Sequence, residues 1–182
     1  MCGIAGFLNK EITSDQIHKE ISSMIKGINH RGPDGNGYWI DDRSKLVLAN
    51  TRLAIQDLSE NGNQPMHSKS GRYLIVFNGE IYNFKKLKLE YLNNINSLGN
   101  SDTEVFLDLI DKFGLIESLK FLEGMFAFAL WDTYEQNLTL GRDRIGEKPL
   151  YFGYSSNKFI FSSELKGIKK LSFFNNSIDF ES

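Results

Sequence analysis

The sequence has a single cysteine, Cys2, among its 182 residues. One cysteine excludes an intrachain disulfide, and a domain of this length can bury an adequate core without one. The first ten residues hold only a short apolar stretch before Asn9 and Lys10, and they lack the basic region and cleavage site of a secretory signal. These absences predict a cytoplasmic protein in a reducing compartment.

Long apolar runs and blocks of like charge are also missing. No stretch approaches the ~20 apolar residues that span a bilayer, and the formal net charge is only -2. A basic surface is typical of nucleic-acid-binding proteins, so we expect neither nucleic acid nor a membrane as a partner. The histidines His18, His30 and His67 have no spacing typical of a metal site, and we expect no metal in this chain.

The patterning that is present indicates a strand-rich chain with helices in its middle. Short apolar runs bounded by Gly, Asn and Asp predict strands, which cover residues 2–8, 38–40, 45–50, 72–77, 125–131, 136–141, 150–154 and 158–163. The strand at 72–77 should end at the turn dipeptide Asn78-Gly79. The strand at 125–131 is apolar without alternation, which indicates burial on both faces.

Apolar residues at helical spacing predict four helices. The first begins near Ser14 or Asp15, either of which could cap it, and ends before the turn at 31–35. The second follows Asn83 and reaches residue 95, the third follows a capping box at 101–104, and the fourth covers 115–122. With strands at both ends and helices between them, we expect one α+β domain over residues 1–182, built of two sheets covered by helices.

Cys2 is the candidate nucleophile. Removal of Met1 would leave a thiol and a free α-amine on one residue. An α-amine has a pKa of about 7.7–8.0, so part of it is an unprotonated base at neutral pH. The amine could accept the thiol proton and return it to a leaving group, so no histidine is required. The alternative is that Cys2 is a small apolar residue at the start of a strand.

A series of motifs resembles the glutamine-hydrolysing domain of asparagine synthases, a class II glutamine amidotransferase of the N-terminal nucleophile hydrolases. In chain order they are CGIAG (2–6), RGPDG (31–35), RLAIQD (52–57), QP (64–65), NGEIYN (78–83), SDTE (101–104), GMFAFA (124–129), RDR (142–144) and GEKPLY (146–151). Each motif alone is weak, but their order over nearly the whole chain is specific. The resemblance implies a four-layer αββα sandwich of two antiparallel sheets. It also implies hydrolysis of glutamine to glutamate and ammonia through a thioester on Cys2.

The resemblance also implies roles for individual residues. Asn78 and Gly79 would form the oxyanion hole with a side-chain NH2 and a backbone N–H; a plain hairpin turn is the alternative. Arg52 would hold the α-carboxylate of L-glutamine as a planar fork. Asp102, with Glu80 nearby, would meet the α-ammonium, although Asp102 could instead serve only to cap a helix.

The remaining expectations concern the pocket wall and the charged loops. The backbone around Leu53, Ile55 and Gln56 would line the pocket. Residues 31–35 would form a loop near the site, and the charges at 142–144 and 147–148 would shape a loop without taking part in catalysis. Asparagine synthases commonly have histidine where this chain has Asn50 and Asn63, which puts the polarity of the pocket in doubt.

The resemblance implies a partner that the chain does not contain. Asparagine synthases carry a synthetase domain with a Gly-rich phosphate loop, and no Ser-Gly-Gly type loop occurs here. ATP, magnesium and aspartate would bind that missing domain or subunit, which would receive the ammonia, and we expect no cofactor in this domain. Two alternatives stay open: an acceptor other than aspartate, such as a sugar or another acid, and a non-catalytic binding or regulatory module of the same fold.

Overall fold

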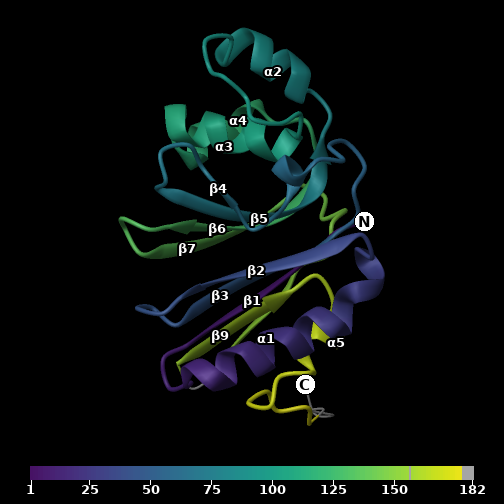
Figure 1. The fold of residues 1–182 in the computed structure, drawn as a ribbon, viewed down its shortest axis with the longest axis vertical. Coiled ribbons are helices and arrows are strands. Elements are labelled where there is room, and N and C mark those ends of the chain that lie inside the picture. Colours follow the sequence, from purple (N-terminus) through teal and green to yellow (C-terminus); the bar gives the residue numbers. More distant parts are fainter. Residues whose placement is uncertain (156, 178–182) are drawn as a thin grey trace.

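The computed structural model describes residues 1–155 and 157–177, which form four layers (Figure 1). Two antiparallel sheets lie face to face in the middle, α2, α3 and α4 cover the outside of one, and α1 and α5 cover the outside of the other. The predicted αββα arrangement is therefore confirmed.

The first sheet has five strands in the order β2-β3-β1-β9-β8. Their bounds are β1 Gly3–Asn9, β2 Gly35–Asp41, β3 Leu46–Arg52, β8 Tyr151–Ser155 and β9 Lys158–Ser162. The N-terminal strand β1 lies at the centre and pairs antiparallel with β3 and β9. The hairpin expected between residues 38 and 50 is present, with both strands longer than predicted. Burial of β1 fixes the backbone immediately after Cys2.

The second sheet has four strands in the order β4-β5-β6-β7. Their bounds are β4 Met66–His67, β5 Tyr73–Ile81, β6 Gly124–Asp132 and β7 Asn137–Arg142. The prediction that a strand ends in a turn at Asn78-Gly79 is wrong, because β5 continues to Ile81 in register with β6. A Cβ on Gly79 would lie 2.6 Å from the Cα of Phe126 and would also meet the carbonyl of Met125. Glycine is needed there for close approach of the two strands.

Helices α1 (Ser14–Ile28) and α5 (Leu165–Ile168) cover the first sheet. The buried side chains of α1 recur at helical spacing, and Ile17, Ile21 and Met24 are fully buried. The expected caps Ser14 and Asp15 are wrong by one and two positions. Thr13 is the N-cap and forms a capping box with Gln16, because its hydroxyl accepts from the Gln16 N–H at 3.4 Å while its own N–H donates to Gln16 Oε1 at 3.0 Å.

Helices α2 (Phe84–Tyr91), α3 (Asp102–Phe113) and α4 (Leu115–Phe121) cover the second sheet. Helix α2 ends before the predicted residue 95. Ser101 caps α3 by accepting from the Glu104 N–H at 3.2 Å. The Glu104 carboxylate does not complete the predicted capping box, because it accepts from the N–H groups of Leu98 (2.7 Å) and Gly99 (3.0 Å) instead. The loop before α3 is thus tied to the helix.

Three apolar clusters fill the three interfaces between the layers. The predicted two-sided burial of residues 125–131 is confirmed by β6, whose side chains alternate between two of these clusters. Phe128 and Leu130 face α3 and its neighbours, while Ala129 and Trp131 face the other sheet. Within the described part of the chain, no helix combines the length and apolar character needed to cross a bilayer.

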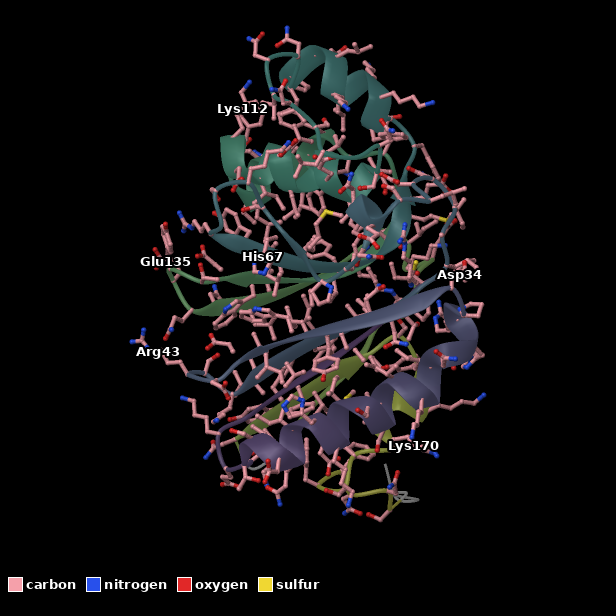
Figure 2. All side chains as sticks on the ribbon, viewed as in Figure 1. Asp34, Arg43, His67, Lys112, Glu135 and Lys170 are labelled. Atoms are coloured by element: carbon pink, nitrogen blue, oxygen red, sulfur yellow. The ribbon has the colours of Figure 1, made fainter. Side chains whose placement is uncertain are left out.

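The two ends of the sandwich differ. Arg43, between β2 and β3, and Glu135, between β6 and β7, lie at one end (Figure 2). Asp34 lies at the opposite end, on the same side as the marked N-terminus (Figures 1 and 2). Short hairpins thus close one end of both sheets, and the chain start lies at the other.

Candidate active site

A cavity of about 110 Å³ lies beside Cys2. Its wall includes all nine residues that were expected to catalyse or to bind glutamine, namely Cys2, Arg52, Leu53, Ile55, Gln56, Asn78, Gly79, Glu80 and Asp102. Cys2 precedes β1 and Arg52 ends β3 in the first sheet, whereas Asn78 and Gly79 lie in β5 of the second. The cavity is therefore built jointly by both sheets.

The thiol of Cys2 is half-buried and held by one backbone unit. The Leu53 N–H donates to Cys2 Sγ at 3.4 Å, and Sγ lies 3.6 Å from the Leu53 carbonyl oxygen, to which it can donate. The thiol is therefore positioned by both backbone polar groups of Leu53. Leu53 was expected only to line the pocket, and the structure places its backbone against the thiol of Cys2.

Arg31 fixes the backbone of Cys2 from the other side. Its Nε donates to the Cys2 carbonyl at 3.0 Å and its Nη1 pairs with Glu164 at 3.0 Å. Burial raises the pKa of Glu164, but hydrogen bonds from Arg31 and His30 outweigh it and hold that pKa below its ordinary value. Residues 31–35 were expected to form a loop near the site; Arg31 does contact Cys2, but it ends a 3-10 helix (Asn29–Arg31) and Gly35 already begins β2.

Asn78 faces the cavity with an unused donor. The side chain is 1% exposed, and its Nδ2 has no hydrogen-bond partner among the described residues. Leaving a buried polar group unpaired costs about 1–3 kcal/mol, so such groups call for an explanation. Because Asn78 and Cys2 line the same cavity, the free NH2 group is available to a ligand bound next to the thiol.

The acidic side of the cavity is formed by Asp102 and Glu80. Burial raises the pKa of Asp102 to about 6, against the lowering effect of the N–H groups of Ile81 and Thr103. Ser101 supplies the helix cap, and Asp102 Oδ2 instead accepts from the Ile81 N–H at 2.8 Å. Asp102 is therefore not the N-cap residue of α3, and its carboxylate also joins the helix to β5.

Gln56 extends this acidic side. Its Nε2 donates to Glu80 Oε1 at 3.1 Å, and its Oε1 is buried without a partner among the described residues. A carbonyl oxygen beside two carboxylates makes a set of acceptors suited to a cationic group such as an ammonium. Gln56 was expected to contribute its backbone, and the structure adds its side chain.

Arg52 holds the loop that closes the cavity. Its guanidinium donates to Asn63 Oδ1 at 2.6 Å and to the carbonyls of Ser59 (2.9 Å) and Asp57. These bonds use three of its five N–H donors. Hydrogen bonds from the Asn100 N–H and from Ser59 lower the pKa of Asp57. The chain from Arg52 to Asn63 is thereby folded back on itself, and Ile55 contributes to the cavity wall while most of its surface is exposed.

The two asparagines that depart from the family pattern differ in position. Asn63 contacts Arg52 directly. Asn50 is buried in the middle of β3, with an unpartnered Nδ2, and does not line the cavity. The doubt about pocket polarity therefore concerns Asn63 more than Asn50.

Asp143 organises the loop after β7. Its carboxylate accepts backbone N–H groups from four residues, Phe126, Ile145, Glu147 and Lys148. Burial raises the pKa of Asp143, but these N–H groups outweigh it and hold that pKa below its ordinary value. Arg142 donates to the carbonyls of Lys148 (2.6 Å) and Gly146 (2.5 Å). These charges shape the loop as expected.

Sequence reasoning missed the side chain of Lys148. Its side chain is buried, lines the cavity and places Nζ 2.8 Å from the sulfur of Met1. Periodicity gives the direction of side chains in helices and strands, but Lys148 lies in an irregular loop where no such signal exists. Met125 in β6 lines the cavity as well. Among the described residues, no group of three or more His, Cys, Asp and Glu side chains is placed to hold a metal ion.

Comparison with known proteins gives consistent matches over the whole chain. The family model described as a glutamine amidotransferase domain matches residues 1–182. Putative asparagine synthetase [glutamine-hydrolyzing] 2 of Methanocaldococcus jannaschii is 41% identical over 186 residues, which cover 92% of this chain and 35% of that protein. Asparagine synthetase B of Escherichia coli is 36% identical over 169 residues, covering 92% and 30%.

A relative with a different name has a similar sequence identity to this chain. Amidase chry2 of Gibberella zeae is 37% identical over 175 residues, covering 91% of this chain and 26% of that protein. The chain thus spans about a quarter to a third of the length of these relatives. Among solved structures, glutamine phosphoribosylpyrophosphate amidotransferase from B. subtilis has a TM-score of 0.76 at 22% identity, covering 92% of this chain and 43% of that one. That likeness shows the N-terminal nucleophile hydrolase fold.

Proposed function

This chain belongs to the glutamine amidotransferase domain family, and we propose that it hydrolyses L-glutamine to glutamate and ammonia through a thioester on Cys2. It is homologous to the glutamine-hydrolysing asparagine synthetases. One observation carries the proposal: the Asn78 Nδ2, which has no partner among the described residues, and the thiol of Cys2 line a single cavity.

The first step forms the thioester. The free α-amine of Cys2 takes the thiol proton while Sγ attacks the side-chain carbonyl carbon of glutamine. The Leu53 N–H, 3.4 Å from Sγ, stabilises the thiolate. Asn78 Nδ2 and the Gly79 N–H receive the oxyanion, where fixed donors act on charge as it develops. The C–N bond then breaks, and the proton held by the α-amine leaves with ammonia.

The second step releases glutamate. Water attacks the thioester carbonyl with the α-amine as general base, the same donors stabilise the second oxyanion, and the C–S bond breaks to regenerate the thiol. With Met1 in place the nitrogen of Cys2 is an amide and cannot accept a proton. Activity therefore requires removal of Met1.

Selectivity for glutamine comes from the charged groups around the cavity. Arg52 would bind the α-carboxylate with N–H donors that the loop does not use. The α-ammonium would lie between Asp102, Glu80 and Gln56, whose buried Oε1 lacks a partner among the described residues. A ligand lacking either charge would leave one of these sets without its counter-charge.

The ammonia would pass to a synthetase domain or subunit that uses ATP and magnesium to amidate aspartate. The 41% and 36% identity to asparagine synthetases supports aspartate as the acceptor. The 37% identity to amidase chry2 favours the alternative of another acceptor on the same glutaminase module.

Glutamate and ammonia release from protein whose Met1 is absent by intact-mass measurement tests the hydrolysis. We expect turnover, its abolition in Cys2→Ala, and no change in Ile116→Ala, which alters an exposed residue of α4. Acid quenching during turnover should trap a glutamyl adduct on Cys2. Undiminished turnover in Cys2→Ala would refute the mechanism, and no turnover by Met1-free protein would favour a non-catalytic module. Incubation of this protein together with its synthetase domain or subunit, glutamine, ATP and aspartate would test the acceptor.

A further inference from the structure

Lys148 is a buried cationic side chain without a counter-ion. It lies between β7 and β8 and is 4% exposed. Its Nζ contacts Met1 Sδ at 2.8 Å and forms no ion pair with any carboxylate of the described residues. A thioether is a weak hydrogen-bond acceptor, and buried charges are normally paired. This environment indicates that Nζ meets a different group in the working protein.

The loop around Lys148 holds the side chain in the cavity. Its N–H donates to Asp143 Oδ2 at 3.1 Å, and its carbonyl accepts from Arg142 Nε at 2.6 Å. With both backbone groups fixed and Pro149 following, the side chain has little freedom to turn outward. The loop therefore keeps the Lys148 side chain in the cavity that Cys2, Asn78 and Gly79 also line.

Removal of Met1 changes what Lys148 faces. The side chain in contact with Nζ belongs to the residue joined to the nitrogen of Cys2. Once that residue is cleaved, the contact is lost and a free amine stands at the point of cleavage. Nζ and the amine–thiol pair of Cys2 then line one small cavity from which the Met1 side chain is absent.

We propose that Lys148 is a positioning residue that keeps the amine–thiol pair of Cys2 in its reactive form. This inference rests on the proposed function of Cys2. The cationic side chain attracts the thiolate and repels a protonated α-amine. Both effects favour the state in which the pair has lost its first proton, which is the state that attacks an amide.

The other charged groups near Cys2 are already engaged. Arg52 is bonded to its loop, and Arg31 is paired with Glu164 while it holds the Cys2 carbonyl. Three carboxylates, Asp57, Glu80 and Asp102, also line the cavity and accept hydrogen bonds from Asn100, Gln56 and Ile81. Among the described residues, Lys148 is the charged side chain whose terminal atom contacts the N-terminal residue.

The test compares pH profiles of Met1-free protein. Lys148→Met removes the charge at similar size, Lys148→Arg keeps it, and Lys158→Met removes a lysine paired with Glu11 as the matched control. Two profiles are measured for each variant: kcat/KM for glutamine, and the rate of Cys2 alkylation by iodoacetamide without glutamine. We expect the acid limb of both profiles to move up by about one pH unit in Lys148→Met, as loss of a nearby charge predicts. Lys148→Arg and Lys158→Met should keep the original midpoint.

The outcomes separate this inference from the proposed function. A uniform loss of rate in Lys148→Met with an unmoved midpoint in both assays would overturn the role of Lys148. A shifted alkylation profile in a protein that never hydrolyses glutamine would support Lys148 and refute the glutaminase. Urea unfolding of each variant shows that the compared proteins are folded.

Discussion

The carboxylate of Asp102 accepts a hydrogen bond from the backbone N–H of Ile81 at 2.8 Å. The bond joins the first turn of α3 to the last residue of β5, beside Asn78 and Gly79. The same carboxylate is buried near Glu80, and its burial raises its pKa to about 6 from an ordinary value of 3.8. Asp102 is therefore a fixed group that ionises close to physiological pH.

Asp102→Asn should stabilise the protein near neutral pH. The pKa of Asp102 is raised in the folded protein, so the folded state binds more protons than the unfolded state between about pH 4 and 6. The contribution of Asp102 to the unfolding free energy therefore falls as pH rises through that window. Asparagine can still accept from Ile81 without a buried charge. We expect a gain of about 2 kcal/mol at pH ~7.5 and little at pH ~4, measured by urea unfolding. A less stable variant at pH ~7.5 would contradict this account.

The same substitution should weaken glutamine binding. Loss of the carboxylate removes a counter-charge for the α-ammonium, so KM should rise about tenfold or more at pH ~7.5. In the unsubstituted protein KM should fall as pH rises through about 6, because Asp102 becomes ionised. If KM did not change between pH ~5 and ~7.5, Asp102 would have no role in binding glutamine.

Asn78→Ala should slow catalysis without loss of stability. Removal of one oxyanion donor lowers kcat by about 10²–10³-fold with little change in KM. The variant also deletes a buried amide nitrogen that lacks a partner among the described residues, so the folded state loses no hydrogen bond there. Asn50→Ala is the matched control, because Asn50 is equally buried with an unpartnered Nδ2 but lies outside the cavity wall. Equal losses of kcat in both variants would refute the assignment.

Arg52→Lys should raise KM for glutamine more than Asn63→Ala does. Lysine has three N–H donors and cannot donate to the three loop oxygens while directing further N–H groups at the α-carboxylate, so we expect an increase of about tenfold or more. Asn63→Ala removes one contact of 2.6 Å and leaves the guanidinium in place. Steady-state kinetics at fixed pH measures both effects. A larger change for Asn63→Ala would show that orientation of Arg52, rather than its chemistry, limits binding.

Gly79→Ala should destabilise the second sheet. The added Cβ would lie 2.6 Å from the Cα of Phe126, a backbone atom that can move only if β5 and β6 separate. We expect a loss of about 2–4 kcal/mol of unfolding free energy. Gly35→Ala is the control, because a Cβ there meets no atom within 4 Å. Comparable stability of the two variants would show that the strands tolerate the side chain.

The residue pattern alone predicted the elements with a clear apolar pattern, either periodic or unbroken. Helix α1 follows from Ile17, Ile21 and Met24, and the buried strand β6 follows from an unbroken apolar run. The extension of β5 through Asn78-Gly79 could not be predicted, because that dipeptide favours a turn and only pairing with β6 overrides the preference. Thr13 was missed as a cap because the helix boundary is uncertain by a residue or two.

For the candidate site, the sequence predicted which residues take part but not how they contact one another. The resemblance identified nine residues that the fold gathers around one cavity. It did not indicate the contacts among them, such as the Leu53 N–H at the thiol or the bond from Asn63 to Arg52, because such contacts depend on how loops fold. The burial of Lys148 has no counterpart in the local sequence, since a charged residue in a loop is usually exposed.

Cys2 precedes β1 of one sheet and Asn78 lies in β5 of the other, and the two sheets pack against each other through the apolar side chains between them. Neither strand ladder fixes the distance from sulfur to amide, so that distance depends on how tightly Leu74, Val76 and Trp131 interlock with Ile4 and Phe161. The rate of the proposed ammonia release should therefore depend strongly on how well the side chains between the two sheets are ordered. A swollen state that kept every hydrogen-bonded strand but let the layers slide would look folded by far-ultraviolet circular dichroism and would already be inert.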